Sequence, residues 1–131
     1  MITDKPIRVE EHTIGDDNYS CGGVVTFTGV VRAHNHGRPV TGIRYDCYRE
    51  MAEAELQRIV EEVTATCGAT AIRAVHRIGE LKPGDIALLV VAAGAHRKAA
   101  FDAAQRTIDG IKERLPIWKK EHYADATAEW L

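Results

Sequence analysis

The sequence has almost no excess charge of either sign, and this absence narrows the classes of partner. It carries 17 lysines and arginines against 19 aspartates and glutamates, so the formal net charge is only -2. Such a balance does not call for a nucleic acid or an anionic membrane as a partner. Any basic binding site must therefore be a local cluster of side chains.

Paired cysteines are also missing. Cys21, Cys47 and Cys67 are widely spaced and form no CxxC pair, which argues against a disulfide framework and against a zinc site. We expect reduced, mostly buried thiols. His34 and His36 could ligate a metal, but no third ligand at a suitable spacing accompanies them. A solvated turn is the favoured interpretation, and no metal is predicted.

Long apolar runs, repeats and linkers are absent as well. The apolar stretches have the length of strands, and the first six residues lack the apolar core of a signal peptide. No internal repeat or low-complexity tract divides the chain. We therefore expect one domain over residues 1–131 that acts in the cytoplasm and does not bind a membrane.

The apolar pattern predicts several strands. Residues 24–31 are rich in β-branched side chains and lead into a polar turn at 34–38, with 43–48 as the expected hairpin partner. Further strands are expected at 72–78 and 86–93, joined through a type II turn at Pro83 and Gly84. The strand at 86–93 is almost wholly apolar, so it should be buried on both faces in the middle of a sheet.

Two helices should cover this sheet. Ala52, Leu56, Ile59 and Val63 recur at helical spacing from about residue 50, and Gly68 fits a helix cap. The second helix carries an apolar stripe before Pro116 stops it. This stripe consists of Phe101, Ala104, Ile108, Ile111 and Leu115. Strand pairs followed by single helices favour an α+β fold with a largely antiparallel sheet.

Basic side chains at the ends of these elements are candidates for an anion site. Arg32 follows the first long strand, and His96 and Arg97 lie between the buried strand and the last helix. Backbone N–H groups and basic side chains converge on anions at such positions. Lys112 lies about four helical turns beyond Arg97, and Lys119 follows the helix stop. Each residue alone is most often a solvated surface charge, but their combination favours a phosphate pocket.

For the other polar and aromatic residues, a structural role is weighed against a role in a binding site. His76 and Arg77 lie inside a predicted strand, where packing and pairing are the favoured roles. Trp118 and Trp130 could fill the core, as large aromatic side chains usually do. Because Trp118 stands beside two lysines, it could instead form the wall of a pocket for a flat heterocycle.

Four motifs occur in order between about Cys21 and Trp130. They are VVTFTGVVR at 24–32, HRIGEL at 76–81, HR at 96–97 with Phe101 following, and PIWKKE at 116–121. Together they closely resemble the large, catalytic subunit of molybdopterin synthase, the MoaE family. The resemblance implies an α/β-hammerhead fold and a homodimer. A small ubiquitin-like subunit would dock at each end to form a heterotetramer.

The resemblance also implies sulfur transfer in molybdenum cofactor biosynthesis. In that family the small subunit ends in Gly-Gly, and its C-terminal thiocarboxylate enters a pocket of the large subunit. Two such sulfurs convert cyclic pyranopterin monophosphate into the dithiolene of molybdopterin. The present sequence ends in Trp130 and Leu131, so the partner is expected to bring the sulfur. Neither a redox cysteine motif nor a cofactor is then required of this chain.

Residue roles follow from the same resemblance. Lys112 and Lys119 match the catalytic lysines and also contact the substrate, while Phe27 matches a position near the incoming tail. The other substrate positions are Val30, Val31, Arg32, His96, Arg97, Lys120 and Glu121. Two alternatives remain open: a non-catalytic anion-binding module would not need Lys112, and an interaction scaffold would tolerate the loss of all these charges.

Overall fold

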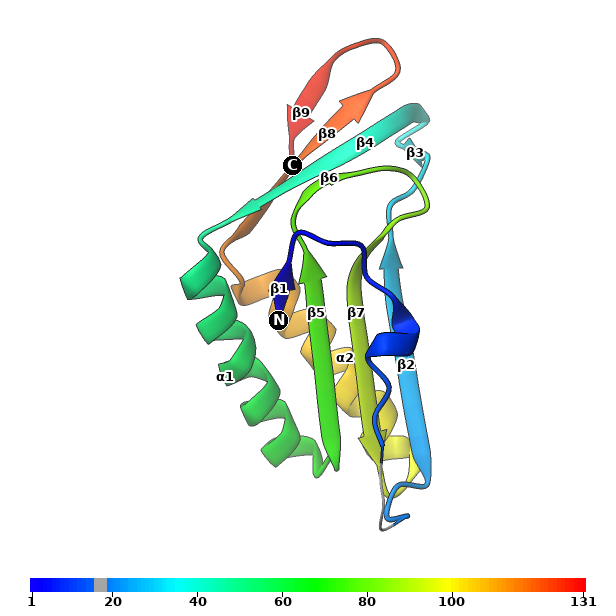
Figure 1. Ribbon diagram of the computed structural model, residues 1–131, viewed down its shortest axis with the longest axis vertical. Helices are drawn as coiled ribbons and strands as arrows, with labels where there is room; N and C mark the ends of the chain where they lie inside the picture. Colours follow the sequence, from blue (N-terminus) through cyan, green and yellow to red (C-terminus); the bar gives the residue numbers. More distant parts are fainter. Residues whose placement is uncertain (16–18) are drawn as a thin grey trace.

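The computed structural model describes residues 1–15 and 19–131, which form two sheets and two long helices (Figure 1). The first sheet has the order β1-β5-β7-β2. Its strands are β1 (Ile2–Thr3), β2 (Gly23–Val30), β5 (Ala71–Arg77) and β7 (Ile86–Gly94). β7 pairs antiparallel with both β2 and β5, and only the short β1 adds a parallel pairing. Both helices cover one face of this sheet.

The second sheet crosses the end of the first one, as Figure 1 shows. It has the order β3-β4-β8-β9, and β6 also pairs with β4. Its strands are β3 (His34–Asn35), β4 (Arg38–Cys47), β6 (Gly79–Leu81), β8 (Ile117–Tyr123) and β9 (Ala128–Trp130). The predicted α+β class with mostly antiparallel pairing is confirmed, and the crossed sheets fit the expected hammerhead arrangement.

Strand β7 is the centre of the hydrophobic core. Leu88 and Val90 on one face pack in the core cluster that includes both helices. Leu89 and Val91 on the other face pack against the N-terminal segment that contains the short helix η1 (Val9–Glu11). Side chains alternate between the two faces of a strand, so an apolar residue at every position requires cover on both sides. The prediction of a central, fully buried strand is confirmed.

The two helices match the predicted ranges, but one buried face differs. Helix α1 (Arg49–Cys67) buries Ala52, Leu56, Ile59 and Val63 as expected, and it ends at Gly68 with a φ of 65°. Helix α2 (Arg97–Arg114) mainly buries the small residues Ala100, Ala103, Ala104 and Thr107, together with Ile111. The expectation for Phe101 was wrong, because its side chain is 61% exposed. Small side chains on the buried face allow close helix packing, which turns Phe101 outward.

The predicted hairpin between 24–31 and 43–48 is wrong. β2 pairs with β7, whereas β4 pairs with β8 in the other sheet. The polar turn forms a small hairpin of its own, in which His34 pairs with Pro39 across His36 and Gly37 at positive φ. β2 lies beside the buried strand β7 in the first sheet, whereas β4 lies beside β8 in the second, so the two strands belong to different sheets.

The turn before β7 and the three cysteines test two smaller predictions. The type II turn is confirmed, because Gly84 has a φ of 93° and the Asp85 N–H donates to the Lys82 carbonyl oxygen at 3.0 Å. Each of the three cysteines is half-buried, whereas mostly buried thiols were expected. Among the described helices, none has the length and apolar character needed to cross a membrane.

Candidate active site

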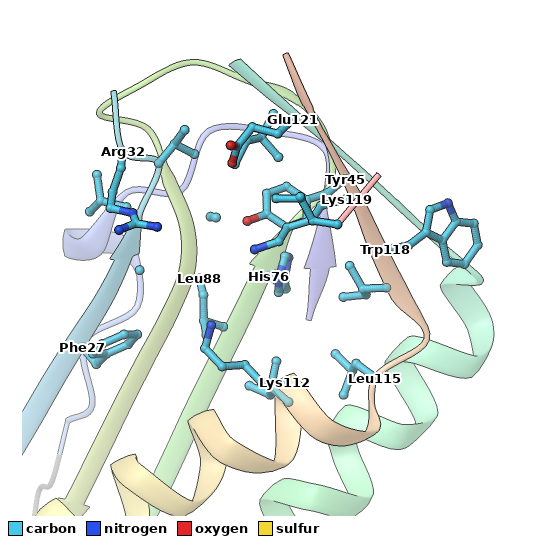
Figure 2. A pocket seen from close by; sticks show the side chains of 18 of the residues that line it. Phe27, Arg32, Tyr45, His76, Leu88, Lys112, Leu115, Trp118, Lys119 and Glu121 are labelled. Atoms are coloured by element: carbon cyan, nitrogen blue, oxygen red, sulfur yellow. The ribbon is translucent and has the colours of Figure 1, made fainter. Parts of the chain in front are cut away.

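A pocket of about 540 Å³ opens where the two sheets meet (Figure 2). The first sheet contributes the end of β2 and parts of β5 and β7, and the second contributes β4 and β8. The last turn of α2 closes a further side. This volume is in the range of sites for small organic ligands.

Three basic side chains reach this pocket from different elements. Arg32 follows β2, Lys112 lies near the end of α2, and Lys119 lies on β8. Figure 2 shows all three side chains directed toward the same space. Their positive charges reinforce one another there, so the site attracts an anion such as a phosphate or a carboxylate.

The environment of Lys119 changes its acidity. Burial lowers the pKa of the Lys119 ammonium, and the nearby charge of Lys112 lowers it further. The negative charge of Glu121 raises the pKa of Lys119, and the positive charge of Arg32 lowers it. An ammonium in this position releases its proton more readily than an exposed lysine, because the neutral amine avoids the cost of a buried charge.

A hydrogen-bonded chain connects Arg32 with the buried acid of the pocket. The Glu121 side chain is only 5% exposed, and its Oε1 accepts a hydrogen bond from Asn35 Nδ2 at 2.8 Å. Arg32 Nη2 donates to Asn35 Oδ1 at 3.4 Å. Asn35 therefore orients the guanidinium and compensates part of the cost of burying the carboxylate.

The inner wall of the pocket contains Tyr45 and His76. The His76 side chain is 7% exposed, and its ring lies edge-on to Tyr45 with 5.0 Å between centroids. His76 Nδ1 lies 2.8 Å from the Arg77 carbonyl oxygen. Burial lowers the pKa of His76 to about 4; the carbonyl contact opposes this, and the charges of Lys112 and Lys119 add to it. The imidazole is therefore neutral at neutral pH.

Apolar side chains form the remaining walls. Phe27, Val30 and Val31 line the side formed by the end of β2, and Trp118 lines the side formed by β8. The Trp118 ring also lies against Tyr48, with 5.1 Å between centroids. Trp118 is 38% exposed, and its ring points away from the space that the three basic side chains share (Figure 2), because Lys119, the next residue on the strand, faces that space. Trp118 therefore neither fills the core nor places its ring beside these cations.

Three of the expected site residues do not line this pocket. Arg97 begins α2 and lies roughly 22 Å from Lys112 along the helix, at about 1.5 Å per residue, and His96 precedes it. A Cβ atom on Gly23, at the start of β2, would lie 3.4 Å from the Arg97 Cα atom, so this end is far from Arg32. Lys120 follows Lys119 on β8 but places its ammonium 5.3 Å from the centroid of the Trp130 ring.

Comparison with known proteins assigns the family. The family model described as MoaE protein matches residues 2–114. The chain belongs to the MoaE family. The molybdopterin synthase catalytic subunit of Staphylococcus carnosus is 42% identical over 99% of this chain and 86% of its own length. Catalytic subunit 1 of Mycobacterium tuberculosis is 38% identical over 99% of this chain and 88% of that protein.

Solved structures agree with this MoaE assignment. Molybdopterin synthase from Staphylococcus aureus superposes with a TM-score of 0.91 at 39% identity, covering 99% of this chain and 94% of that one. Molybdopterin cofactor biosynthesis protein E from Burkholderia multivorans gives a TM-score of 0.79 at 25% identity, covering 100% and 85%. The resemblance carried by the four sequence motifs is confirmed.

Sequence reasoning gave no site role to three residues that build this MoaE pocket. Tyr45 and His76 line it, and Asn35 holds Glu121. Period-two alternation could have suggested that Tyr45 and His76 face inward on their strands. For Asn35 no local signal exists, because its contact with Glu121 joins segments that are 86 residues apart.

Proposed function

We propose that this MoaE chain is the catalytic subunit of a molybdopterin synthase, a cytoplasmic sulfurtransferase of molybdenum cofactor biosynthesis. It receives sulfur from the C-terminal thiocarboxylate of a small ubiquitin-like subunit and transfers it to cyclic pyranopterin monophosphate, forming the dithiolene of molybdopterin. The observation that carries the proposal is the meeting of Arg32, Lys112 and Lys119 in one pocket. The substrate phosphate and the thiocarboxylate are both anions, so both gain from this cluster.

The walls of the pocket suit the other parts of these ligands. Val30 and Val31 line the side of the pocket near Arg32 and can offer apolar contacts to the pterin ring. Phe27 stands at the β2 side of the pocket, where we place the incoming Gly-Gly tail. Glu121 is held by Asn35 beside the cationic groups, where it can orient a polar group of the substrate.

Lys112 and Lys119 are the proposed catalytic residues. Their ammonium groups stabilise the negative charge that develops as the sulfur adds and the cyclic phosphate opens. Burial favours the neutral amine of Lys119, so this residue can exchange a proton with the reacting groups during the transfer. Lys112 contributes its charge from the opposite side of the pocket.

We further propose that the chain works as a homodimer, within a heterotetramer that contains two small subunits. The length of α2 keeps His96 and Arg97 away from the pocket of their own chain. Their proposed contacts with the substrate therefore require the pocket of the second copy. Lys120 keeps its proposed substrate contact if its side chain leaves Trp130 and turns toward the rim.

Product formation with a competent partner tests the function. The chain is mixed with a thiocarboxylated small subunit and cyclic pyranopterin monophosphate, and dithiolene formation is measured. The wild-type protein and Lys5→Ala, which removes an exposed lysine, should both form product. Absence of product from the wild type would contradict the proposal.

The Lys112→Ala variant separates the enzyme from the two alternatives. The proposal expects it to retain measurable binding of the cyclic pterin while losing most of the sulfur transfer. Full activity of Lys112→Ala would contradict the assigned chemistry. Binding of the small subunit by a wild-type chain that never forms dithiolene would favour the scaffold instead.

A further inference from the structure

The charged groups of the pocket are almost entirely hydrogen-bond donors. Arg32, Lys112 and Lys119 have no acceptor when charged, so among these charged groups only the Glu121 carboxylate, whose Oε1 accepts a hydrogen bond from Asn35, can accept. A simple anion needs only donors. The heterocycle of a pterin also carries N–H and O–H groups, and these require an acceptor in a partly buried site.

His76 can supply this acceptor. Its Nδ1 lies 2.8 Å from the Arg77 carbonyl oxygen, and a carbonyl only accepts, so the proton of the neutral ring belongs on Nδ1. Nε2 then carries a free lone pair. No described residue forms a hydrogen bond with Nε2. The described polar atoms that are both inaccessible to solvent and without a hydrogen-bond partner do not include Nε2 either. Nε2 is therefore open to the pocket that His76 lines.

The surroundings keep this ring neutral. Lys112 of α2 and Lys119 of β8 act on it with positive charge, and Tyr45 of β4 packs against it. Figure 2 shows the His76 ring between the side chains of Lys119 and Lys112. A proton on Nε2 would add a further positive charge to this group, so the ring remains an acceptor at neutral pH.

Resting on the proposed function, we propose that His76 binds the heterocycle of the substrate: its Nε2 atom accepts a hydrogen bond from an N–H or O–H group of the bound pterin. Arg32 and the two lysines hold the phosphate of the same molecule. The pocket thereby distinguishes a phosphorylated heterocycle with donor groups from an anion that has none. His76 is a substrate-contacting residue in this account rather than only a packing residue of β5.

Two matched substitutions separate the two nitrogens of the ring. His76→Asn keeps an amide near the position of Nδ1, where it can still donate to the Arg77 carbonyl, but leaves no group at Nε2. His76→Gln reaches the position of Nε2 with its amide oxygen. We expect His76→Asn to bind cyclic pyranopterin monophosphate about tenfold more weakly than the wild type, and His76→Gln to stay within about threefold.

Titration calorimetry with the cyclic pterin measures these affinities, and sulfate serves as a competitor that has only acceptors at neutral pH. The apparent affinity for sulfate should be the same in the wild type and both variants. His12→Gln changes a histidine outside this pocket and should bind the pterin like the wild type. Equal pterin affinity of the wild type and His76→Asn would overturn the proposal, as would an equal loss of pterin and sulfate binding.

A measurement on the unchanged protein covers the case in which a variant does not fold. In the nitrogen NMR spectrum of histidine-labelled protein, the Nε2 signal of His76 should move when the pterin is added and remain in place with sulfate. An unmoved signal with bound pterin would overturn the role of His76 alone. A wild-type chain that binds no cyclic pterin would overturn the proposed function, and the ligand assigned to His76 with it.

Discussion

The two sheets of this molecule are held together in different ways. The first sheet is built around β7, in which Leu89 and Val90 are fully buried between two apolar layers. The second sheet carries charge networks on its surface: Arg44 forms ion pairs with Asp46 at 3.1 Å and with Glu80 at 3.4 Å. Exposed ion pairs contribute little to stability, whereas buried apolar area contributes most of it. Stability therefore resides mainly in the first sheet.

The pocket draws on both sheets, which explains its location. His76 and Leu88 give it a rigid wall from the first sheet, while Tyr45, Lys119 and Glu121 come from the second. The second sheet can carry charged groups because the first sheet supplies the stability that tolerates them. Substitutions in the two sheets should consequently separate activity from stability.

The largest effect is expected for Lys119→Ala. Loss of a charged, proton-exchanging group from the second sheet should lower the rate of dithiolene formation about a thousandfold. The free energy of unfolding should change little, because burial disfavours the charged form of this lysine. Single-turnover kinetics and urea unfolding measure the two quantities, with Lys5→Ala as the control. If Lys119→Ala lost much stability and kept its activity, the proposed division between a stabilising first sheet and a functional second sheet would be contradicted.

Leu89→Ala should have the opposite profile. It removes a fully buried side chain from the central strand of the first sheet, and the resulting cavity should lower the free energy of unfolding by about 3 kcal/mol. Activity of the folded fraction should persist, because Leu89 faces the N-terminal segment and does not line the pocket. Met51→Ala on the exposed side of α1 is the control, and an equal loss there would contradict the expectation.

His76 should make the free energy of unfolding depend on pH in the acidic range. Its pKa is about 4 in the folded chain against an ordinary value of 6.5, so the unfolded chain binds more protons between these two values. The free energy of unfolding should therefore fall as the pH drops from about 6.5 to about 4, by roughly 2 to 3 kcal/mol. Urea titrations of the wild type and His76→Gln over this range measure it. Identical slopes for the two proteins would show that His76 has no part in the acid dependence.

A smaller effect is expected for Asn35→Ala, at the connection between the turn and β8. It frees Arg32 and leaves Glu121 without its 2.8 Å hydrogen bond. The affinity for the cyclic pterin should fall about fivefold, which corresponds to about 1 kcal/mol. Asn35→Asp should be worse, because it places a second carboxylate against Glu121. Calorimetric titration decides, and stronger binding by Asn35→Asp than by Asn35→Ala would exclude this role.

The smallest effect belongs to the surface of the second sheet. Arg44→Ala removes two exposed ion pairs, and the free energy of unfolding should change only slightly, because solvent screens such pairs. Measurement in low and high salt sharpens this prediction, since the difference between the two proteins should shrink as salt screens the pairs. A loss as large as that of Leu89→Ala would remove the distinction between the sheets.

Local patterns predicted the elements better than their partners. The buried stripe of α1 and its end at Gly68 follow from the spacing of a few neighbouring residues, and both were predicted. The hairpin was not, because alternation in β4 shows that one face is covered but does not identify the neighbouring strand. β8, which pairs with β4, begins 70 residues after β4 ends. The orientation of Phe101 likewise depends on the helix packing of α2.

The residues of the candidate site were likewise predicted in part from the sequence and in part found only in the tertiary structure. Motifs pointed to Arg32, Lys112 and Lys119, and the crossing of the two sheets brings them to one pocket. The same motifs also pointed to His96 and Arg97, but a helix of 18 residues separates them from Lys112 by its length. Asn35 and the open Nε2 of His76 became visible only with the pocket itself.

By itself, the sequence determined the family, the two helices, the buried central strand and the types of side chain available for an anion. These features depend on short-range periodicity and on motifs that occur in a linear order. Only the tertiary structure decided which strands pair, which cations share a pocket and which histidine nitrogen remains open. The physical reason is that pairing and burial depend on contacts between distant segments, and the two sheets bring those segments together only when the chain folds.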